Sequence, residues 1–369
     1  MIDTSIFNPS KNYESTNKTL FLNGEHGLLD SIHRPHPELF RLYKLLKSLD
    51  WDELEFPLES CQAEFMRRPK SLCNKMIQTL SYQWEADSVA AHSIAPVIAP
   101  FVSDTDLWLA YSKISENEGL HALAYSEIVK YGLGGDTKLA MAQVLENQEV
   151  LKRLRTVANA LGYVKKVGAK LTLGLISPDS DEAIDAAMLF VCVMLVLERV
   201  QFMPSFAVTF AIGEISAFIP IVKTVQKICT DEYTVHILVG KYVLGNEQQV
   251  PRSIKSLERI RSTVETVIDE VRTAELNFIQ VLHEDGEELP GATPKMLGQW
   301  VDFAVTDVYN VLKWKNPFPV INKNPLGYMS TWIDQGKSQG SPQETREGGY
   351  LLGGFVTSTE PVVFDIDDL

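Results

Sequence analysis

The sequence lacks the patterns that mark secreted, membrane-spanning and nucleic-acid-binding proteins. Its 369 residues contain four cysteines, none of them in a CxxC pair, so we expect a reduced cytoplasmic protein. Basic residues are outnumbered by acidic ones, 34 to 48, and the net charge of -14 argues against nucleic-acid binding. The most apolar run, residues 186–197, is too short to cross a bilayer and predicts a buried helix. The amino-terminal segment shows no signal-peptide pattern.

Strand alternation bounded by paired turn signals is also scarce, and helical periodicity takes its place. Between residues 249 and 284, apolar side chains recur every three or four positions with charged residues between them. Most segments between turn signals are about 20 to 35 residues long, which exceeds the usual globular helix. The breaks fall at Pro57 and at residues 96–100, 132–135, 177–179 and 245–246. This pattern predicts an all-α helical bundle.

The two ends of the chain differ from its middle. Residues 1–35 mix polar and isolated apolar side chains and predict an irregular arm on the surface, followed by a helical domain over residues 36–315. Residues 316–369 are rich in proline, glycine and acidic residues and predict an extended, flexible tail. At its end, residues 362–369 alternate apolar and acidic side chains. That alternation fits either a frayed terminus or a docking peptide that orders on a partner.

Two of the seven histidines follow a glutamate at helical spacing. Glu118 precedes His121 by three positions, and Glu232 precedes His236 by four. Both spacings place the carboxylate and the imidazole on one face of a helix, so one helix can supply two ligands to a metal ion. A single pair of this kind often arises by chance.

Each Glu/His pair is preceded, about thirty residues earlier, by another acid in an apolar helix: Asp87 and Glu198. The chain therefore contains two similar units, which match the general template of ferritin-like dimetal-carboxylate bundles. A buried acid costs several kcal/mol unless it is paired or metal-bound, and two cations among four carboxylates and two imidazoles remove that cost. Oxygen and imidazole ligands without thiolate favour iron or manganese. The alternative is four buried acids, each with its own arginine or lysine.

Tyr125 lies four residues after His121 and hence on the same helix face, one turn further on. It is either a core tyrosine whose hydroxyl finds a nearby acceptor or a phenol beside an oxidisable dimetal site. Phe202, Phe206 and Ile228 stand at helical spacing from the predicted ligands and predict a dry pocket around Tyr125. A phenol shielded in this way is what a stable tyrosyl radical requires.

These residues together resemble the small, radical-generating subunit of class I ribonucleotide reductases. The resemblance runs from about residue 35 to the C-terminus, and its specific part is the ordered set of ligands with the tyrosine. The matching strings are WEADS (84–88), SENEGLHALAY (115–125), ERVQFMPSF (198–206), DE…H (231–236), NPLGYMSTW (324–332) and GYLLG (349–353). The resemblance implies an all-α, ferritin-like helical bundle with a dimetal-carboxylate site, extra helices and a flexible C-terminal tail.

The same resemblance assigns roles to individual residues. It implies that Tyr125 carries the radical inside a pocket of Phe202, Phe206 and Ile228. The implied metal ligands are Asp87, Glu118, His121, Glu198, Glu232 and His236. They are expected to hold two iron ions per chain, with manganese as a possible substitute, and oxygen is expected to activate the site.

Three further residues resemble those that carry oxidation out of the family's small subunit. Trp51 resembles the tryptophan that passes the electron, and Asp231 resembles the aspartate that links it to a metal-bound histidine. Tyr350 resembles the tail tyrosine that relays oxidation to a cysteine of the large subunit, where ribonucleotides are reduced to deoxyribonucleotides. The tail ending at Leu369 would dock on that large subunit, and the small subunit would form a homodimer.

Two other functions remain open for the same set of residues. One is a stand-alone ferritin-like dimetal oxidase or oxygenase, which would not need Tyr350 or the acidic tail. The other is a non-catalytic metal-storage protein, which would bind many ions per chain. An inactive relative is disfavoured because both the ligands and Tyr125 are present.

The second Glu/His pair departs from the family pattern. The family usually has the spacing ExxH in both units, whereas Glu232 and His236 are separated by three residues. We expect the additional residue to be absorbed by a π-bulge, which functional helices tolerate.

Overall fold

The computed structural model describes residues 8, 11, 19–24, 27–134, 138, 142 and 148–333. These residues belong to the first of two compact units, Met1–Gln339. Most of the predicted N-terminal arm lies outside the described residues. So do Tyr350 and the predicted docking peptide in the tail.

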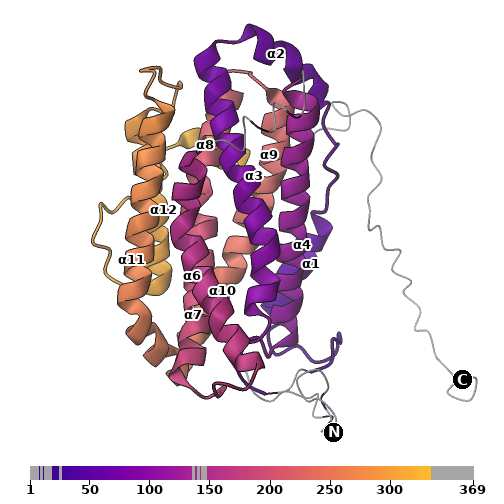
Figure 1. The fold of residues 1–369 in the computed structure, drawn as a ribbon, viewed down its shortest axis with the longest axis vertical. Coiled ribbons are helices and arrows are strands. Elements are labelled where there is room, and N and C mark those ends of the chain that lie inside the picture. The colour runs from indigo at the N-terminus through magenta and orange to yellow at the C-terminus, as the bar shows by residue number, and fades with distance from the viewer. Residues whose placement is uncertain are drawn as a thin grey trace, which may run out of the picture. The chain divides into compact units, whose positions relative to one another are not determined.

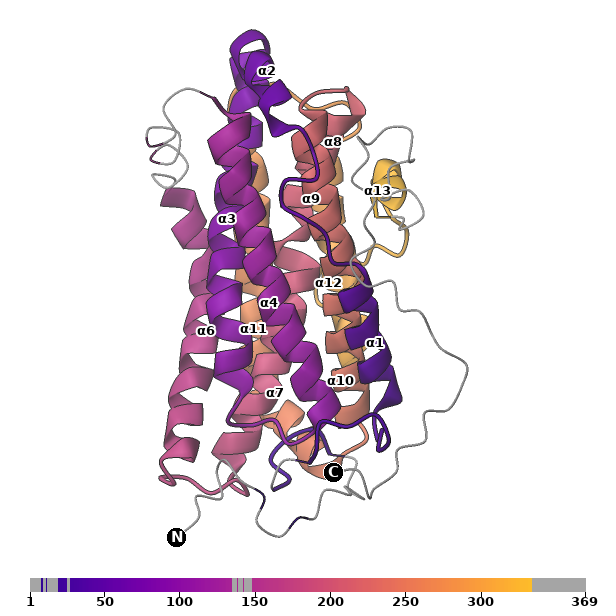
Figure 2. The same cartoon turned by 90° about the vertical axis from the view of Figure 1, so that its right-hand side faces the viewer.

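The described part of the chain is a bundle of helices, and its β pairing is limited to two isolated bridges. The long helices run side by side in both views (Figure 1, Figure 2). The α-helices are α1 (Pro37–Ser48), α2 (Gln62–Arg67), α3 (Lys70–Ile98), α4 (Thr105–Glu127), α6 (Gln148–Thr172), α7 (Asp181–Val196), α8 (Met203–Glu214), α9 (Ile219–Asp231), α10 (Ile237–Glu247), α11 (Pro251–Leu282), α12 (Pro294–Leu312) and α13 (Gly327–Trp332). Between them lie the 3-10 turn η1 (Leu58–Cys61) and the π-helical turns η2 (Ile128–Gly132), η3 (Leu197–Gln201) and η4 (Glu232–His236).

Side-chain caps and prolines fix where several helices begin. Asp104 accepts a hydrogen bond from the backbone of the first turn of α4, Ser180 does so for α7, and Thr293 for α12. Pro251 occupies the first turn of α11, where its missing N–H costs nothing. These local signals set the limits of helices whose stability comes from burying their apolar faces against one another.

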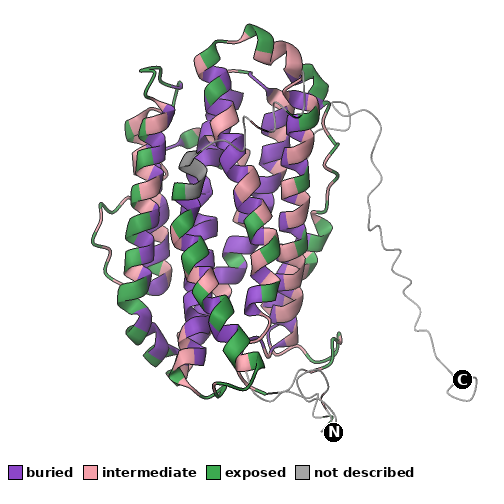
Figure 3. Cartoon of the chain, in the orientation of Figure 1, coloured by how far each residue is buried: buried purple, intermediate pink, exposed green. Residues whose placement is uncertain are grey.

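Most apolar positions that the periodicity predicts are buried, and buried residues run along the long helices of the bundle (Figure 3). Helix α11 covers the predicted periodic segment and buries its apolar positions from Leu257 to Val271, although Ile254 is 39% exposed. The apolar run 186–197 forms the buried part of α7 and the start of η3, and α7 packs against α6, α10 and α11. The prediction of a buried helix there is confirmed. No helix among the described residues is long and apolar enough to cross a membrane.

The structure differs from the prediction near both ends of the bundle. Leu20 and Phe21, in the predicted surface arm, are 0% and 4% exposed, and backbone N–H groups of Ser103 and Asp104 donate to Leu20. In the predicted extended tail, residues 327–332 form α13, which packs against α8. The Trp332 ring stacks on a phenylalanine of α8, so tertiary contacts hold a helix too short to be stable alone.

Candidate metal centre

The structure brings all six predicted ligands together in the core of the bundle. Helix α3 supplies one carboxylate, α4 a carboxylate and an imidazole, η3 one carboxylate, and η4 a carboxylate and an imidazole. Each of the six side chains is 3% exposed or less. Their ligand atoms form two groups, each within 4.8 Å: Asp87, Glu118, His121 and Glu232, and then Glu118, Glu198, Glu232 and His236. Glu118 and Glu232 belong to both groups, so each of them would be within reach of both ions.

The donor set fits two divalent cations. All eight oxygens of the four carboxylates, and the Nδ1 atoms of both histidines, are buried without a hydrogen bond. Taking an ion out of water costs several kcal/mol even after relaxation, so four uncompensated carboxylates would be strongly destabilising. Two divalent cations balance four negative charges and use the oxygen and imidazole ligands that iron and manganese accept. Asp87, Glu118, His121, Glu198, Glu232 and His236 are therefore the residues that would hold the ions.

The predicted π-bulge at the second Glu/His pair is confirmed. The turn η4 begins at Glu232 and ends at His236, so the additional residue lies within one π-helical turn. His236 Nδ1 lies 2.8 Å from Glu232 Oε2 and 3.3 Å from Glu118 Oε1. In the first Glu/His pair, on α4, His121 Nδ1 lies 3.1 Å from Glu232 Oε1. The two imidazoles thus face the shared carboxylates in the same way despite their different spacing.

The metal-free site retains protons that bound ions would replace. Burial raises the pKa of Asp87, and the neighbouring Glu118 carboxylate raises it further; burial likewise raises the pKa of Glu198. Burial alone would lower the pKa of both histidines, but the surrounding carboxylates outweigh it and raise the pKa of His121 and His236. Glu232 differs: the facing histidines hold its pKa below the usual range in spite of burial. Metal binding must therefore release protons.

Trp51 and Asp231, predicted to act together, are in contact. The indole Nε1–H of Trp51 donates to Asp231 Oδ2 at 2.9 Å, and His121 Nε2–H donates to the same oxygen at 3.1 Å. The Trp51 and His121 rings are stacked, with centroids 6.2 Å apart. The partly buried tryptophan is thereby connected to a predicted metal ligand through one carboxylate oxygen.

Two polar residues near the centre were not predicted from the sequence. Asn117 is 1% exposed and accepts a hydrogen bond from His236 Nε2 at 3.0 Å. Gln83, one turn before Asp87 on α3, is fully buried and neither of its amide atoms has a hydrogen bond. A signal for Asn117 exists in the sequence, because it directly precedes Glu118 as Asp231 directly precedes Glu232.

Tyr125 is buried on α4, one turn after the predicted ligand His121. Its side chain is 1% exposed, and its hydroxyl has no hydrogen-bond partner. Burial raises the pKa of Tyr125, and the nearby Asp87 carboxylate raises it further, so the neutral phenol is strongly favoured. Phe202, Phe206 and Ile228, the predicted pocket residues, are each 0% exposed, and the two phenylalanine rings stack at 6.0 Å.

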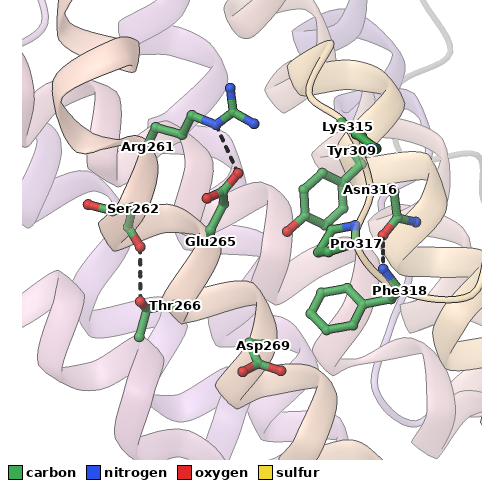
Figure 4. Close-up of a pocket in the computed structure, with 10 residues that line it drawn as sticks. All are labelled: Arg261, Ser262, Glu265, Thr266, Asp269, Tyr309, Lys315, Asn316, Pro317 and Phe318. Atoms are coloured by element: carbon green, nitrogen blue, oxygen red, sulfur yellow. Dashed lines mark hydrogen bonds and ion pairs between the residues drawn. The ribbon is translucent and has the colours of Figure 1, made fainter.

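A surface pocket elsewhere on the bundle does not involve these residues. It has a volume of about 910 Å³ and lies between α11 and the segment that follows α12 (Figure 4). Arg261, Glu265 and Asp269 of α11 line it with Tyr309 and Phe318, and Arg261 donates to Glu265 at 2.8 Å. Tyr309 is only 1% exposed, so its hydroxyl is hardly accessible from the pocket. The polar groups that a ligand could reach there are mainly the charged side chains of α11. The buried centre is the stronger candidate site.

Comparison with protein families and curated proteins gives one consistent result. The family model described as "Ribonucleotide reductase, small chain" matches residues 32–325. The ribonucleoside-diphosphate reductase subunit beta of Buchnera aphidicola (from Schizaphis graminum) is 22% identical over 323 residues, covering 83% of this chain and 84% of its own. The subunit of the same name from Haemophilus influenzae is 22% identical over 331 residues, covering 86% and 87%.

Solved structures show the same fold. The ribonucleotide reductase R2 subunit from Clostridium botulinum superposes with a TM-score of 0.75 at 15% identity, over 90% of this chain and 99% of that one. The dimanganese(II)-NrdF of Streptococcus sanguinis gives a TM-score of 0.65 at 12% identity, over 84% of this chain and 100% of that one. At these identities the likeness concerns the fold alone.

Proposed function

The chain belongs to the ribonucleotide reductase small-chain family, and on that premise we propose that its buried centre generates a stable radical on Tyr125. It is a ribonucleoside-diphosphate reductase beta subunit, part of an oxidoreductase that works with a large subunit. The observation that carries the radical proposal is a buried phenol whose hydroxyl has no hydrogen bond and whose pKa the Asp87 carboxylate helps to raise.

The residues around Tyr125 have the properties that this role requires. When bound, the pair of metal ions supplies the oxidising power, with oxygen as the oxidant. The Asp87 carboxylate acts on the phenol electrostatically, since it helps to raise the pKa of Tyr125, and we propose that it takes part in moving the phenol proton. The buried Phe202, Phe206 and Ile228 exclude water and external reductants, which would otherwise quench the radical.

We propose that Trp51 passes the electron that carries oxidation from the buried centre towards the large subunit. Its hydrogen bond to Asp231, and the bond from His121 to the same oxygen, give a continuous contact from a predicted metal ligand to a partly buried indole. From there Tyr350 would carry the oxidation to the large subunit, which reduces ribonucleotides to deoxyribonucleotides. The acidic tail that ends at Leu369 would dock there. Removing residues 347–369 should abolish reductase activity while leaving the radical intact.

Three further properties complete the proposal. Two iron ions per chain are proposed as the cofactor, and manganese fits the same ligands. We also propose that the protein is cytoplasmic and forms a homodimer. Val89 on α3 and Leu123 on α4 are exposed apolar side chains that a second copy could cover. Elemental analysis of protein purified without added metal, with anomalous diffraction, would identify the ions. Uptake of many ions per chain would instead favour metal storage.

The radical assignment is tested by paramagnetic resonance. Metal-loaded protein exposed to oxygen should give a tyrosyl radical signal, and Tyr125→Phe should lose this signal while it still binds two ions. Tyr111→Phe is a matched control, because Tyr111 is another buried tyrosine of α4 whose hydroxyl has no hydrogen bond. An unchanged signal in Tyr125→Phe, or its loss in the control alone, would reject the assignment.

A further inference from the structure

Two residues outside the ligand set connect the two halves of the centre crosswise. Asp231, which precedes Glu232, accepts a hydrogen bond from His121 of the other unit. Asn117, which precedes Glu118, accepts one from His236 of the other unit at 3.0 Å. Asn117 Nδ2 also donates to Asp231 Oδ2 at 3.1 Å. The residue before each glutamate thus accepts a hydrogen bond from the histidine of the opposite Glu/His pair. These two residues, Asn117 and Asp231, are also hydrogen-bonded to each other.

The orientation of the Asn117 amide follows from its partners. A carboxylate oxygen can only accept, so the amide nitrogen must face Asp231 and the amide oxygen must face His236. His236 Nε2 therefore donates to Asn117, and its proton is held on the side away from the carboxylates. Its Nδ1 atom faces Glu118, Glu198 and Glu232 and is the atom available to an ion.

We propose that Asn117 is the positioning residue of the second metal site. It fixes the His236 imidazole on the π-helical turn with Nδ1 directed at the ion, as Asp231 does for His121. The inference rests on the proposed pair of metal ions. Partners of metal-bound histidines typically change metal affinity by about 10–100-fold when they are removed.

The structure gives a reason why this histidine needs such a partner. The backbone of η4 carries one residue more than a regular turn, so the helix alone does not set His236 in the position that a three-residue spacing would give. The hydrogen bond from Nε2 restores a defined ring orientation from the opposite helix. Because the partner is a neutral amide, it adds no negative charge to a centre that already holds four carboxylates.

The test is an equilibrium titration of the full, metal-stripped chain with Mn²⁺, in which free Mn²⁺ is measured by paramagnetic resonance. The wild-type chain should bind two ions. Asn117→Leu, close in volume but unable to hydrogen-bond, should keep one ion and bind the other about 10–100-fold more weakly. Asn117→Asp should stay close to wild type, because an acid beside Asp231 retains its proton and can both donate and accept.

The control is Ser115→Ala on the same helix, which removes the hydroxyl oxygen that accepts a hydrogen bond from the Ala95 N–H, away from the centre. It should bind both ions normally, and its thermal unfolding measures the cost of losing a helix–helix bond alone. Two full-affinity ions in Asn117→Leu, or equal weakening of both, would overturn the inference. Asn117→Ala replaces the leucine variant if that one does not fold. If the wild-type chain binds no pair of ions, the proposed function fails first.

Discussion

The two halves of the centre reach the same geometry with different backbones. In the first half, Glu118 and His121 stand three residues apart on the regular helix α4. In the second, Glu232 and His236 stand four apart on the π-helical turn η4, and Glu198 lies on another π-helical turn, η3. All six predicted ligand residues nevertheless fall within two compact groups. The comparison shows that a π-helical turn compensates for the longer Glu/His spacing of the second half. A sequence search that required the ExxH spacing in both halves would therefore miss the second half.

Deleting one residue from each half is the sharpest way to break this comparison. Removing Leu120 from α4 rotates everything beyond it by about 100°, which turns His121 and Tyr125 away from the centre. We expect loss of both ions and a destabilisation of roughly 3 kcal/mol or more. Removing Thr234 from η4 should convert the π-turn to an α-turn, keep the flanking helices in phase and retain two ions. Metal stoichiometry and chemical unfolding measure both effects, and loss of the second ion without Thr234 would contradict this interpretation.

The shared carboxylates should matter more than the unshared ones. Glu118→Ala or Glu232→Ala removes a ligand from both groups, so both ions should bind at least about 100-fold more weakly. Asp87→Ala and Glu198→Ala should each weaken mainly one ion. Calorimetric titration with Mn²⁺ distinguishes these patterns. If the shared and unshared variants lose the same single ion, the two-group arrangement is wrong.

A smaller effect is expected from the hydrogen bonds behind His121. Asp231 Oδ2 accepts from Trp51, Asn117 and His121, and an amide oxygen in its place lacks the negative charge that strengthens these three hydrogen bonds. Asp231→Asn should therefore weaken one ion by about tenfold. Trp51→Phe removes a single donor and should leave affinity unchanged in the same titration. A metal defect in Trp51→Phe would show that the indole supports the centre itself.

The smallest effect is a pH dependence of stability that bound metal should abolish. The raised pKa of His121 and His236 stabilises the metal-free fold below the ordinary value of 6.5, and this contribution is lost as the pH rises through their folded-state values. The raised pKa values of Asp87 and Glu198 likewise make the metal-free fold less stable as the pH rises. The lowered pKa of Glu232 has the opposite effect on stability. The melting temperature of stripped protein should fall with rising pH by about 2–4 °C per kcal/mol lost. Metal-loaded protein should not follow this trend, because ions replace the protons.

Much of the bundle could be predicted from periodicity alone. Helix α11 and the buried helix α7 occupy the segments whose apolar pattern indicated them. Helix α13 and the burial of Leu20 could not be predicted, because short segments are ordered by partners that are distant in sequence. The π-helical turn η3 was not predicted from the sequence either, because packing and not composition determines where a helix takes up an additional residue.

The sequence was more informative about the ligands than about what surrounds them. The Glu/His spacing and the two preceding acids identified six side chains that the structure places together. Asn117 was missed because a single amide has no characteristic spacing. Its position before Glu118 is meaningful only when the two units are aligned and Asp231 is seen at the matching place. The buried Gln83 gave no such signal.

The complete burial of the ligand shell has a kinetic consequence. With every predicted ligand side chain 3% exposed or less, an ion would arrive or leave only when the surrounding helices locally open. Exchange is then limited by how often the bundle opens rather than by how tightly the ion is held. The identity of the bound metal would consequently record which ions were present when the site was filled, and would change only slowly when the surroundings change later.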